Sequence, residues 1–147
     1  MIKKYQALDR SPLLEVLQAN IPKYFAPEEF QDFEKYLAKY ANEYFTVHQD
    51  GIVVGGVGCK YDACKKQGII AWIFFHPDFA GKGLGKLAVN HCLEQLKLNE
   101  DIQSVKVRTS QFANLFFEKF GFETILYEKD YWAPGFDLYH MEKEIEN

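Results

Sequence analysis

The spacing of apolar positions changes several times along the chain, and each spacing predicts a different element. After Pro27, apolar side chains recur every three or four positions, at Phe30, Phe33, Leu37 and Tyr40. This spacing places them on one face of a helix. Residues 44–61 instead predict two strands joined at Asp50-Gly51, a pair typical of a tight β-hairpin turn. Residues 68–75 are continuously apolar, as expected of a strand that is buried on both faces.

End signals predict further elements on both sides of these. Residues 2–8 alternate loosely between apolar and polar types, which predicts a first strand. Ser11 is expected to cap a helix whose first position is Pro12. A later helix is expected from Leu84 to about residue 98. Its apolar face is predicted to comprise Leu87, Ala88, Cys92 and Leu96.

The last third of the chain predicts a strand, a short helix and a final strand pair. Residues 104–110 alternate as a strand, and residues 111–122 form a short helix that ends at Gly121. Two antiparallel strands follow, at 123–127 and 136–145, with residues 128–135 as their connection. The order β-α-α-β-β-β-α-β-α-β-β predicts an α+β fold with a mixed sheet. No linker divides the chain, so residues 1–147 are expected to form a single domain.

Composition narrows the classes of function. The chain has 147 residues, 48% of them hydrophobic, which excludes a disordered or fibrous protein. A net charge of −4 argues against a nucleic-acid partner, although the middle of the chain is basic and suits a small anion. No apolar run is long enough to span a membrane, and the N-terminal sequence lacks the apolar stretch of a signal peptide. We therefore expect a cytoplasmic protein with no membrane partner. The three cysteines lack zinc-ligand spacing, so we expect reduced thiols and no metal.

A glycine-rich segment between the apolar strand and the later helix is the main candidate for chemistry. It reads HPDFAGKGLGK over residues 76–86, with Gly81, Gly83 and Gly85 alternating with Lys82, Leu84 and Lys86. A helix start offers free backbone N–H groups and the positive end of the helix dipole, so an anion binds there readily. Glycines let a bulky phosphate approach the backbone. The alternative is a mobile, solvated turn that binds nothing.

The spacing excludes two common phosphate motifs. A Walker loop ends in Gly-Lys-Ser/Thr, but Lys86 is followed by Leu87, which has no hydroxyl for magnesium. A dinucleotide fingerprint requires G-x-G-x-x-G and an acidic residue about 20 positions later. Here the glycines follow G-x-G-x-G, and Val105 and Lys106 occupy the later positions. The ligand is therefore expected to be neither a nucleoside triphosphate nor a dinucleotide.

The segment resembles the pyrophosphate loop of the GNAT superfamily of N-acetyltransferases, whose pattern is Arg/Gln-x-x-Gly-x-Gly/Ala. The match runs from Ala80 through Gly83 and Gly85, and residues 113–122 are similar to the family's short helix with its Lys-x-Gly-Phe ending. The resemblance implies a central mixed, mostly antiparallel sheet with two splayed parallel strands, flanked by about four helices. It also implies acetyl-CoA as cosubstrate, a small-molecule or peptide amine as acceptor, and no metal.

The resemblance assigns donor-binding positions residue by residue. The backbone expected to pair with pantetheine belongs to Ile73, Phe74 and Phe75. The pyrophosphate is expected on the amides of Gly81, Lys82, Gly83, Leu84 and Gly85, with the Lys86 side chain close by. Further contacts are expected from Ser110, Asn114 and Phe117.

The chain departs from the family pattern at two positions. Ala80 replaces the Arg or Gln that opens the loop, which removes one side-chain contact but leaves the backbone amides. Phe117 stands where the family often has a tyrosine that protonates the leaving thiolate, and phenylalanine has no proton to give. Three explanations remain open: another tyrosine serves, the thiolate of pKa about 8.5 leaves unaided, or activity is weakened.

Two residues are candidates for acid–base chemistry. An alkyl amine must lose a proton before it attacks a thioester, and Glu29 at the start of the second helix is a candidate base. The alternative is that Glu29 stabilises the helix N-terminus. Tyr131, in the connection of the last strand pair, is the candidate replacement acid, with Asp130 or Asp137 to hold a cationic amine. The alternative there is a loop that its own aromatic side chains hold in place.

Three hypotheses of function follow. The first is an acetyl-CoA-dependent N-acetyltransferase that acts by direct attack in a ternary complex. The second is a CoA-binding or regulatory module without turnover, which Phe117 favours. The third is an interaction domain whose glycine turn binds nothing. The exposed aromatic side chains expected in the last hairpin also make a homodimer reasonable.

Overall fold

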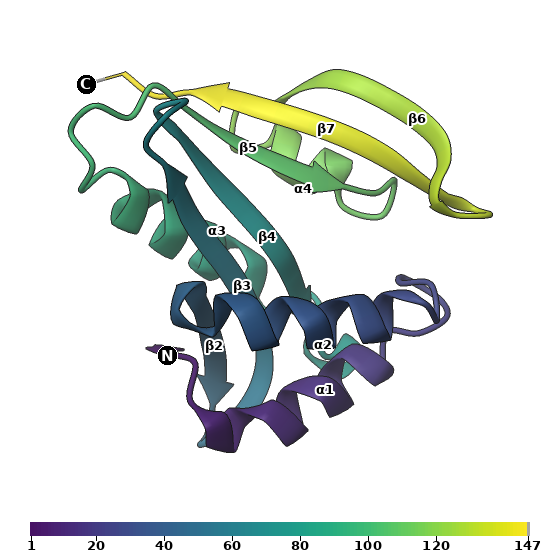
Figure 1. The fold of residues 1–147 in the computed structure, drawn as a ribbon. Coiled ribbons are helices and arrows are strands. Elements are labelled where there is room, and N and C mark those ends of the chain that lie inside the picture. The colour runs from purple at the N-terminus through teal and green to yellow at the C-terminus, as the bar shows by residue number, and fades with distance from the viewer. Residues whose placement is uncertain (147) are drawn as a thin grey trace.

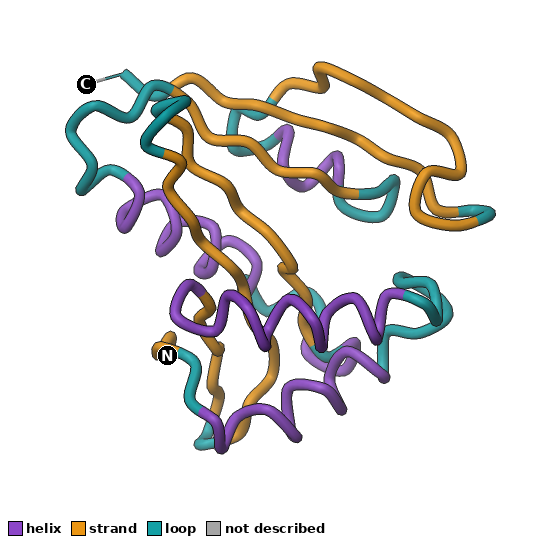
Figure 2. Tube along the Cα trace, in the orientation of Figure 1, coloured by secondary structure: helices purple, strands orange, loops and turns teal. Residues whose placement is uncertain are grey.

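A seven-stranded sheet forms the centre of the computed structural model, which describes residues 1–146 (Figures 1 and 2). Its strands lie in the order β1-β2-β3-β4-β5-β7-β6. Only β4 and β5 run parallel among these neighbours; the other pairs are antiparallel. The mixed, mostly antiparallel sheet expected from the sequence is confirmed. The strands are β1 (Ile2–Lys4), β2 (Tyr44–Gln49), β3 (Ile52–Asp62), β4 (Gln67–Phe75), β5 (Ser104–Thr109), β6 (Glu123–Ala133) and β7 (Phe136–Glu144).

Four α-helices cover the two faces of the sheet in the described part of the chain. They are α1 (Arg10–Gln18), α2 (Glu29–Tyr40), α3 (Leu84–Leu96) and α4 (Asn114–Glu118). Figure 1 shows α1 and α2 on one face, with α3 and α4 on the other. Each pair buries its own apolar core against the sheet, since Phe33 and Phe74 belong to one buried cluster and Val89 and Phe117 to the other.

The hairpin of β2 and β3 follows directly from its turn residues. Asp50 and Gly51 both have positive φ, at 53° and 78°. Asp-Gly tolerates this conformation, which matches the twist of the strands that it joins. The predicted hairpin is confirmed.

The first helix begins earlier than the sequence predicted. A short 3-10 turn over Ala7–Asp9 leads into α1, and the Asp9 carboxylate accepts a hydrogen bond from the Gln6 backbone N–H at 3.0 Å. Ser11 therefore lies inside the helix and does not cap it. The same turn ends β1 at Lys4, so the predicted strand over 2–8 was too long. Pro12 still lies in the first turn, where its missing N–H breaks no intrahelical bond.

Three other expectations were wrong in detail. β4 is not buried on both faces, because several of its residues line the pocket described below. Leu87 is 45% exposed, since the inner face of α3 is formed by Ala88, Val89, Cys92, Leu93 and Leu96. The predicted connection over 128–135 is mostly strand, because irregular pairing with β7 lets β6 continue to Ala133 along the edge of the sheet.

The parallel strands β4 and β5 separate toward their C-terminal ends. Their pairing runs only from Gln67 and Ser104 to Ile70 and Val107, although both strands continue beyond it. One extra residue in β4 disturbs its register with β3 at Trp72, whose φ of 49° is unusual for a tryptophan. A bulge of this kind bends a strand away from its neighbour. The expected splayed pair is therefore present.

Candidate functional site

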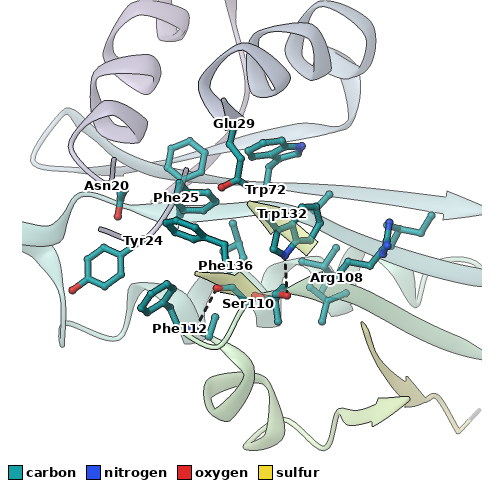
Figure 3. Close-up of a pocket in the computed structure, with 18 of the residues that line it drawn as sticks. Asn20, Tyr24, Phe25, Glu29, Trp72, Arg108, Ser110, Phe112, Trp132 and Phe136 are labelled. Carbon is teal, nitrogen blue, oxygen red and sulfur yellow. Dashed lines mark hydrogen bonds between the residues drawn. The ribbon is translucent and has the colours of Figure 1, made fainter. Parts of the chain in front are cut away.

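A pocket of about 380 Å³ lies where β4 and β5 separate, and Figure 3 shows its side chains. The two strands, the segment between α1 and α2, and residues near the β6–β7 turn all contribute to its lining. Most of the lining side chains are apolar or aromatic. The lining residues are Asn20, Tyr24, Phe25, Glu29, Ile69, Ile70, Ala71, Trp72, Ile73, Phe74, Lys106, Val107, Arg108, Thr109, Ser110, Phe112, Ala113, Trp132 and Phe136.

Backbone at the end of β4 forms one wall of the pocket. Ile73 and Phe74, two of the predicted donor-binding residues, line it, whereas Phe75 does not. The Phe75 carbonyl instead accepts a hydrogen bond from the Asn20 side chain at 3.0 Å. Asn20 is only 5% exposed and also donates to the Val16 carbonyl at 2.9 Å. This amide therefore fixes the end of α1 against the end of β4.

The glycine segment follows β4 and leads into α3. Gly81 and Gly83 have positive φ, at 78° and 76°, and a Cβ on either one would meet no atom within 4 Å. Glycine is therefore required there for its backbone conformation and not for space. Gly83 is the residue before α3, and no side chain caps the helix. The first N–H groups of α3 thus have no partner within the helix, and they face the loop.

Gly85 has a different reason to be glycine. A Cβ at this position would lie 3.0 Å from the Phe116 ring of α4, tighter than ordinary van der Waals contact. The residue lets α3 and α4 approach each other at the wider end of the separated strands. None of residues 81–86 lines the pocket itself, because the loop lies beyond the end of β4.

The predicted residues of the second block are divided between pocket and core. Ser110 lines the pocket, and its hydroxyl accepts a hydrogen bond from the Phe112 N–H at 3.3 Å (Figure 3). Asn114 begins α4 and does not line the pocket. Phe117 is fully buried and packs edge-to-face on Phe116 and Phe122. The structure thus brings Ser110, but neither Asn114 nor Phe117, to the pocket wall.

Glu29 is a buried carboxylate in the wall of this pocket. Its side chain extends from α2 beside Trp72 and is 9% exposed (Figure 3). One carboxylate oxygen accepts a hydrogen bond from the Ala26 N–H at 2.8 Å, and the carboxylate has no other hydrogen bond within residues 1–146. Burial raises the pKa of Glu29 from 4.5 to about 6, although the Ala26 hydrogen bond lowers it. A carboxylate with this pKa is mostly ionised at neutral pH and able to accept a proton.

Tyr131 does not line the pocket and is 43% exposed. The Arg108 guanidinium lies over its ring at 5.0 Å from the centroid, and the ring packs edge-to-face on Trp132. Trp132 and Phe136 line the pocket from the same hairpin, and the indole N–H of Trp132 donates to the Thr109 carbonyl at 3.3 Å. The structure thus places the neighbours of Tyr131, and not Tyr131, in the wall.

Asp130 and Asp137 hold the β6–β7 turn together. Asp130 accepts a hydrogen bond from the Gly135 N–H at 2.7 Å, and Asp137 accepts from the Asp130 N–H and the Tyr127 hydroxyl, both at 2.9 Å. The Asp130 N–H and the Tyr127 hydroxyl lower the pKa of Asp137. Neither carboxylate lines the pocket. These contacts fit the alternative of a self-supported loop.

Sequence reasoning missed several lining residues. The sequence did indicate that Lys106 and Arg108 share one face of a strand, because the alternation of residues 104–110 puts them opposite the buried Val105 and Val107. Asn20 and Phe136 had no signal, since only the packing of the α1–α2 segment and the last hairpin against β4 and β5 brings them to the pocket.

The described residues show neither a metal cluster nor a helix of membrane-spanning length. Within residues 1–146, no group of three or more His, Cys, Asp or Glu side chains is arranged to hold a metal ion. No helix in that range is long and apolar enough to cross a bilayer.

Comparisons with known proteins agree with this geometry. A sequence profile of the acetyltransferase (GNAT) family matches residues 11–122. A comparison with curated proteins gave no match. Among solved structures, Ard1 from Thermoplasma volcanium has a TM-score of 0.81 at 15% identity, over 100% of this chain and 98% of that one. The ribosomal-protein-S18-alanine N-acetyltransferase from Escherichia coli has a TM-score of 0.80 at 15% identity, over 100% and 94%.

A third solved structure contains coenzyme A, the carrier portion of the cosubstrate that the sequence resemblance implies. It is an aminoglycoside 6′-N-acetyltransferase complexed with coenzyme A, with a TM-score of 0.77 at 11% identity, over 100% of this chain and 98% of that one. At these identities the structures establish the fold, and the profile establishes the family. The profile covers most of the chain, including the separated strands and the glycine segment. The chain therefore belongs to the GNAT family of acetyltransferases.

Proposed function

We propose that the protein is an N-acetyltransferase that uses acetyl-CoA and passes the acetyl group directly to a primary amine in a ternary complex. The observation that carries this proposal is the pocket between the separated strands β4 and β5, next to an uncapped helix start. A long donor with a narrow arm and a pyrophosphate fits this arrangement. Acetyl-CoA supplies the electrophilic thioester carbonyl.

The edge of β4 suits the pantetheine arm. The His76 N–H donates to the Val54 carbonyl on β3 at 2.8 Å. Because successive residues direct their backbone groups to opposite edges of a strand, those of Phe75 and Ile73 point toward the gap beside β5. Asn20 already occupies one of these groups, the Phe75 carbonyl. We assign pantetheine pairing to the backbone over Ile73–Phe75.

The loop before α3 suits the pyrophosphate. Gly81 and Gly83 hold the backbone in positive φ, and the N–H groups of Leu84, Gly85 and Lys86 have no capping side chain. Backbone donors and the helix dipole favour a negatively charged ligand there. The loop needs no side chain at Ala80 for this interaction. The flanking lysines add positive charge, although the Lys82 ammonium lies over the Phe79 ring at 4.9 Å.

Glu29 is our candidate for the general base. Its second carboxylate oxygen has no hydrogen-bond partner in the described chain, and its pKa of about 6 leaves it ionised at neutral pH. The amine becomes more acidic as its nitrogen bonds to carbon, so a carboxylate of this pKa is able to accept the proton. The Ala26 N–H holds the carboxylate in place during this transfer.

The thiolate leaves without a tyrosine at position 117. Phe117 is buried and has no proton to donate, but a thiol of pKa about 8.5 is a good leaving group. Tyr131 stays the predicted alternative acid. It does not line the pocket, so its hydroxyl would have to move into the pocket to reach the thiolate. None of the three cysteines lines the pocket, which favours direct transfer over an acetyl-cysteine.

The second candidate function is a CoA-binding module without turnover. The buried Phe117 favours it, because the position offers no proton to a leaving thiolate. The two candidates agree on donor binding and differ only in turnover.

Donor binding is tested by thermal shift with acetyl-CoA and CoA, and turnover by release of free thiol with a panel of amines. Gly83→Glu places an anion and a strained φ at the proposed cradle and should abolish the thermal shift. Gly51→Glu is the matched control: its φ is 78° and its Cβ also meets nothing, but it lies in the β2–β3 turn. Absence of a shift in the wild-type protein would overturn both candidates. A thermal shift without turnover of any amine would exclude the N-acetyltransferase and support the CoA-binding module.

Two further expectations stay predictions. The edge strand β6 exposes Ile125, Leu126 and Tyr127, which is compatible with a homodimer. Sedimentation of the purified protein tests this, and a monomer at all concentrations would contradict it. A cytoplasmic location is tested by fractionation of cells that express the full chain.

A further inference from the structure

Three charged side chains line the pocket, and they come from opposite walls. Glu29 extends from α2, whereas Lys106 and Arg108 extend from β5. Figure 3 shows Glu29 beside Trp72, and Arg108 on the far side of Trp132. The pocket wall therefore holds a carboxylate and a guanidinium, with the Trp132 indole between them in this view.

Arg108 is not neutralised by the protein. In the described chain its guanidinium has no carboxylate within ion-pair distance and makes no hydrogen bond. On β7, the residue opposite it is His140, and the nearby Glu142 is already bonded to His140 at 3.0 Å and to Gln67 at 3.3 Å. The guanidinium N–H groups are thus free to bind a ligand.

Two aromatic rings orient this guanidinium. Its central carbon lies 5.0 Å from the centroid of the Tyr131 ring and 5.8 Å from that of Trp132. A guanidinium held over aromatic rings keeps its edge N–H groups available for a planar anion such as a carboxylate. This gives Tyr131 and Trp132 a role in positioning a cation beside the pocket.

We infer that the amine acceptor of the proposed N-acetyltransferase carries an anionic group, most simply a carboxylate, at the end remote from its amine. The inference rests on the proposed function. The amine lies at Glu29, an apolar body crosses Trp132, and the carboxylate binds Arg108. Polyamines fit poorly, because their second ammonium would meet Arg108 and Lys106.

Most of the remaining pocket wall is apolar. Phe25, Trp72 and Phe136 line the same pocket, and Phe25 and Trp72 stack at 6.2 Å between ring centroids. No acidic side chain other than Glu29 lines the pocket in the described part of the chain. An acceptor that carries several hydroxyl or amino groups would leave them unpaired against these rings.

The experiment compares acceptors that differ only in the anion. Free-thiol release is measured with a series of linear ω-amino acids from glycine to aminooctanoate, each beside the alkylamine of the same length, and with spermidine. We expect one or more of the amino acids to exceed their matched alkylamines by about tenfold or more in kcat/KM. This follows because a hydrogen-bonded charge pair changes binding by at least that factor.

Variants of Arg108 test whether this residue makes the difference. Arg108→Gln should raise KM for the amino acids about tenfold or more and leave the alkylamines within about twofold. Arg108→Lys should restore part of the loss, because it keeps the charge and loses the fork geometry. Arg10→Gln is the matched control: that guanidinium is also exposed, but it pairs with Glu34 outside the pocket. Melting temperatures of all variants show whether the fold is retained.

The outcomes separate this inference from the function on which it rests. Amino-acid preference that disappears in Arg108→Gln and persists in Arg10→Gln supports it. Turnover that is equal for amines and amino acids, or highest for spermidine, overturns the inference about the acceptor but still supports the proposed N-acetyltransferase activity. An equal loss for both substrate classes in Arg108→Gln also overturns it, since that indicates a structural role. Donor binding without turnover of any amine overturns both.

Discussion

Replacing Glu29 by Gln should stabilise the protein above about pH 6 while it lowers activity. The amide keeps an oxygen for the Ala26 N–H and removes the charge that burial disfavours. The folded protein holds its Glu29 proton more tightly than the unfolded chain, whose pKa is near 4.5. Wild-type stability therefore falls as the pH rises from about 4.5 to 6, whereas the variant lacks this fall.

The size of the effect follows from the same pKa. A rise from 4.5 to about 6 corresponds to about 2 kcal/mol, because one pKa unit is worth about 1.4 kcal/mol. Unfolding entropy is about 2.1 cal/mol/K per residue, so 2 kcal/mol corresponds to roughly 6 °C in melting temperature for a chain of 147 residues. The variant and the wild type should melt together below about pH 4.5 and differ by this amount above pH 6.

Melting is followed by differential scanning calorimetry across this pH range, and acetyl transfer by thiol release. We expect Glu29→Gln to lose about 10²-fold or more in kcat if the carboxylate is the base. Glu28→Gln is the matched control, since it lies one residue earlier, is exposed and has no side-chain cap bond. A variant that is less stable than the wild type at pH 7, or a difference that does not depend on pH, would refute the reasoning. Full activity at retained stability would exclude Glu29 as the base.

Three other substitutions test the packing around the site. Asn20→Ala removes two hydrogen bonds from a buried amide and should lower the free energy of unfolding by about 1–3 kcal/mol, measured by urea denaturation. An unchanged free energy of unfolding would show that α1 is not fixed to β4 through this residue. Gly85→Ala places a Cβ 3.0 Å from the Phe116 ring, which opposes the gain in helix propensity of about 1 kcal/mol that alanine brings inside α3. A double-mutant cycle should therefore show that Gly85→Ala is more favourable to stability in a Phe116→Leu background than in the wild type, and equal effects in both backgrounds would show that this contact costs nothing. Phe117→Tyr should destabilise the folded protein by about 1–3 kcal/mol, because the added hydroxyl enters a closed core. An unchanged melting temperature together with a higher kcat would instead show that position 117 reaches the leaving group.

The pocket shows how far sequence reasoning reaches. Glycines at 81, 83 and 85, with a helix after them, indicate a backbone anion site from the sequence alone, because free N–H groups at a helix start are a local property. The tertiary structure adds that the three glycines serve two purposes. Gly81 and Gly83 permit positive φ, whereas Gly85 makes room for Phe116, which lies far away in sequence.

The acid–base candidates show where sequence reasoning stops. Glu29 is a candidate because it starts the second helix, and Tyr131 because it lies in the predicted connection of the last strand pair, yet only Glu29 lies in the pocket wall. The difference arises because β6 continues as a strand through Tyr131 and turns its ring under Arg108, outside the pocket. Irregular strand pairing of this kind depends on β7 and leaves no trace in local spacing.

The sequence by itself determined the order of the elements, the β2–β3 turn, the glycine segment and the family, because these depend on neighbouring residues and their backbone preferences. The tertiary structure decided how far β4 and β5 pair, which side chains enter the gap between them, and that Glu29 is buried there. It also placed Arg108 at the same pocket, with no ion-pair partner among residues 1–146. Burial and separation in space arise from contacts between residues distant in the chain, and these contacts set the pKa of Glu29 and the shape of the pocket.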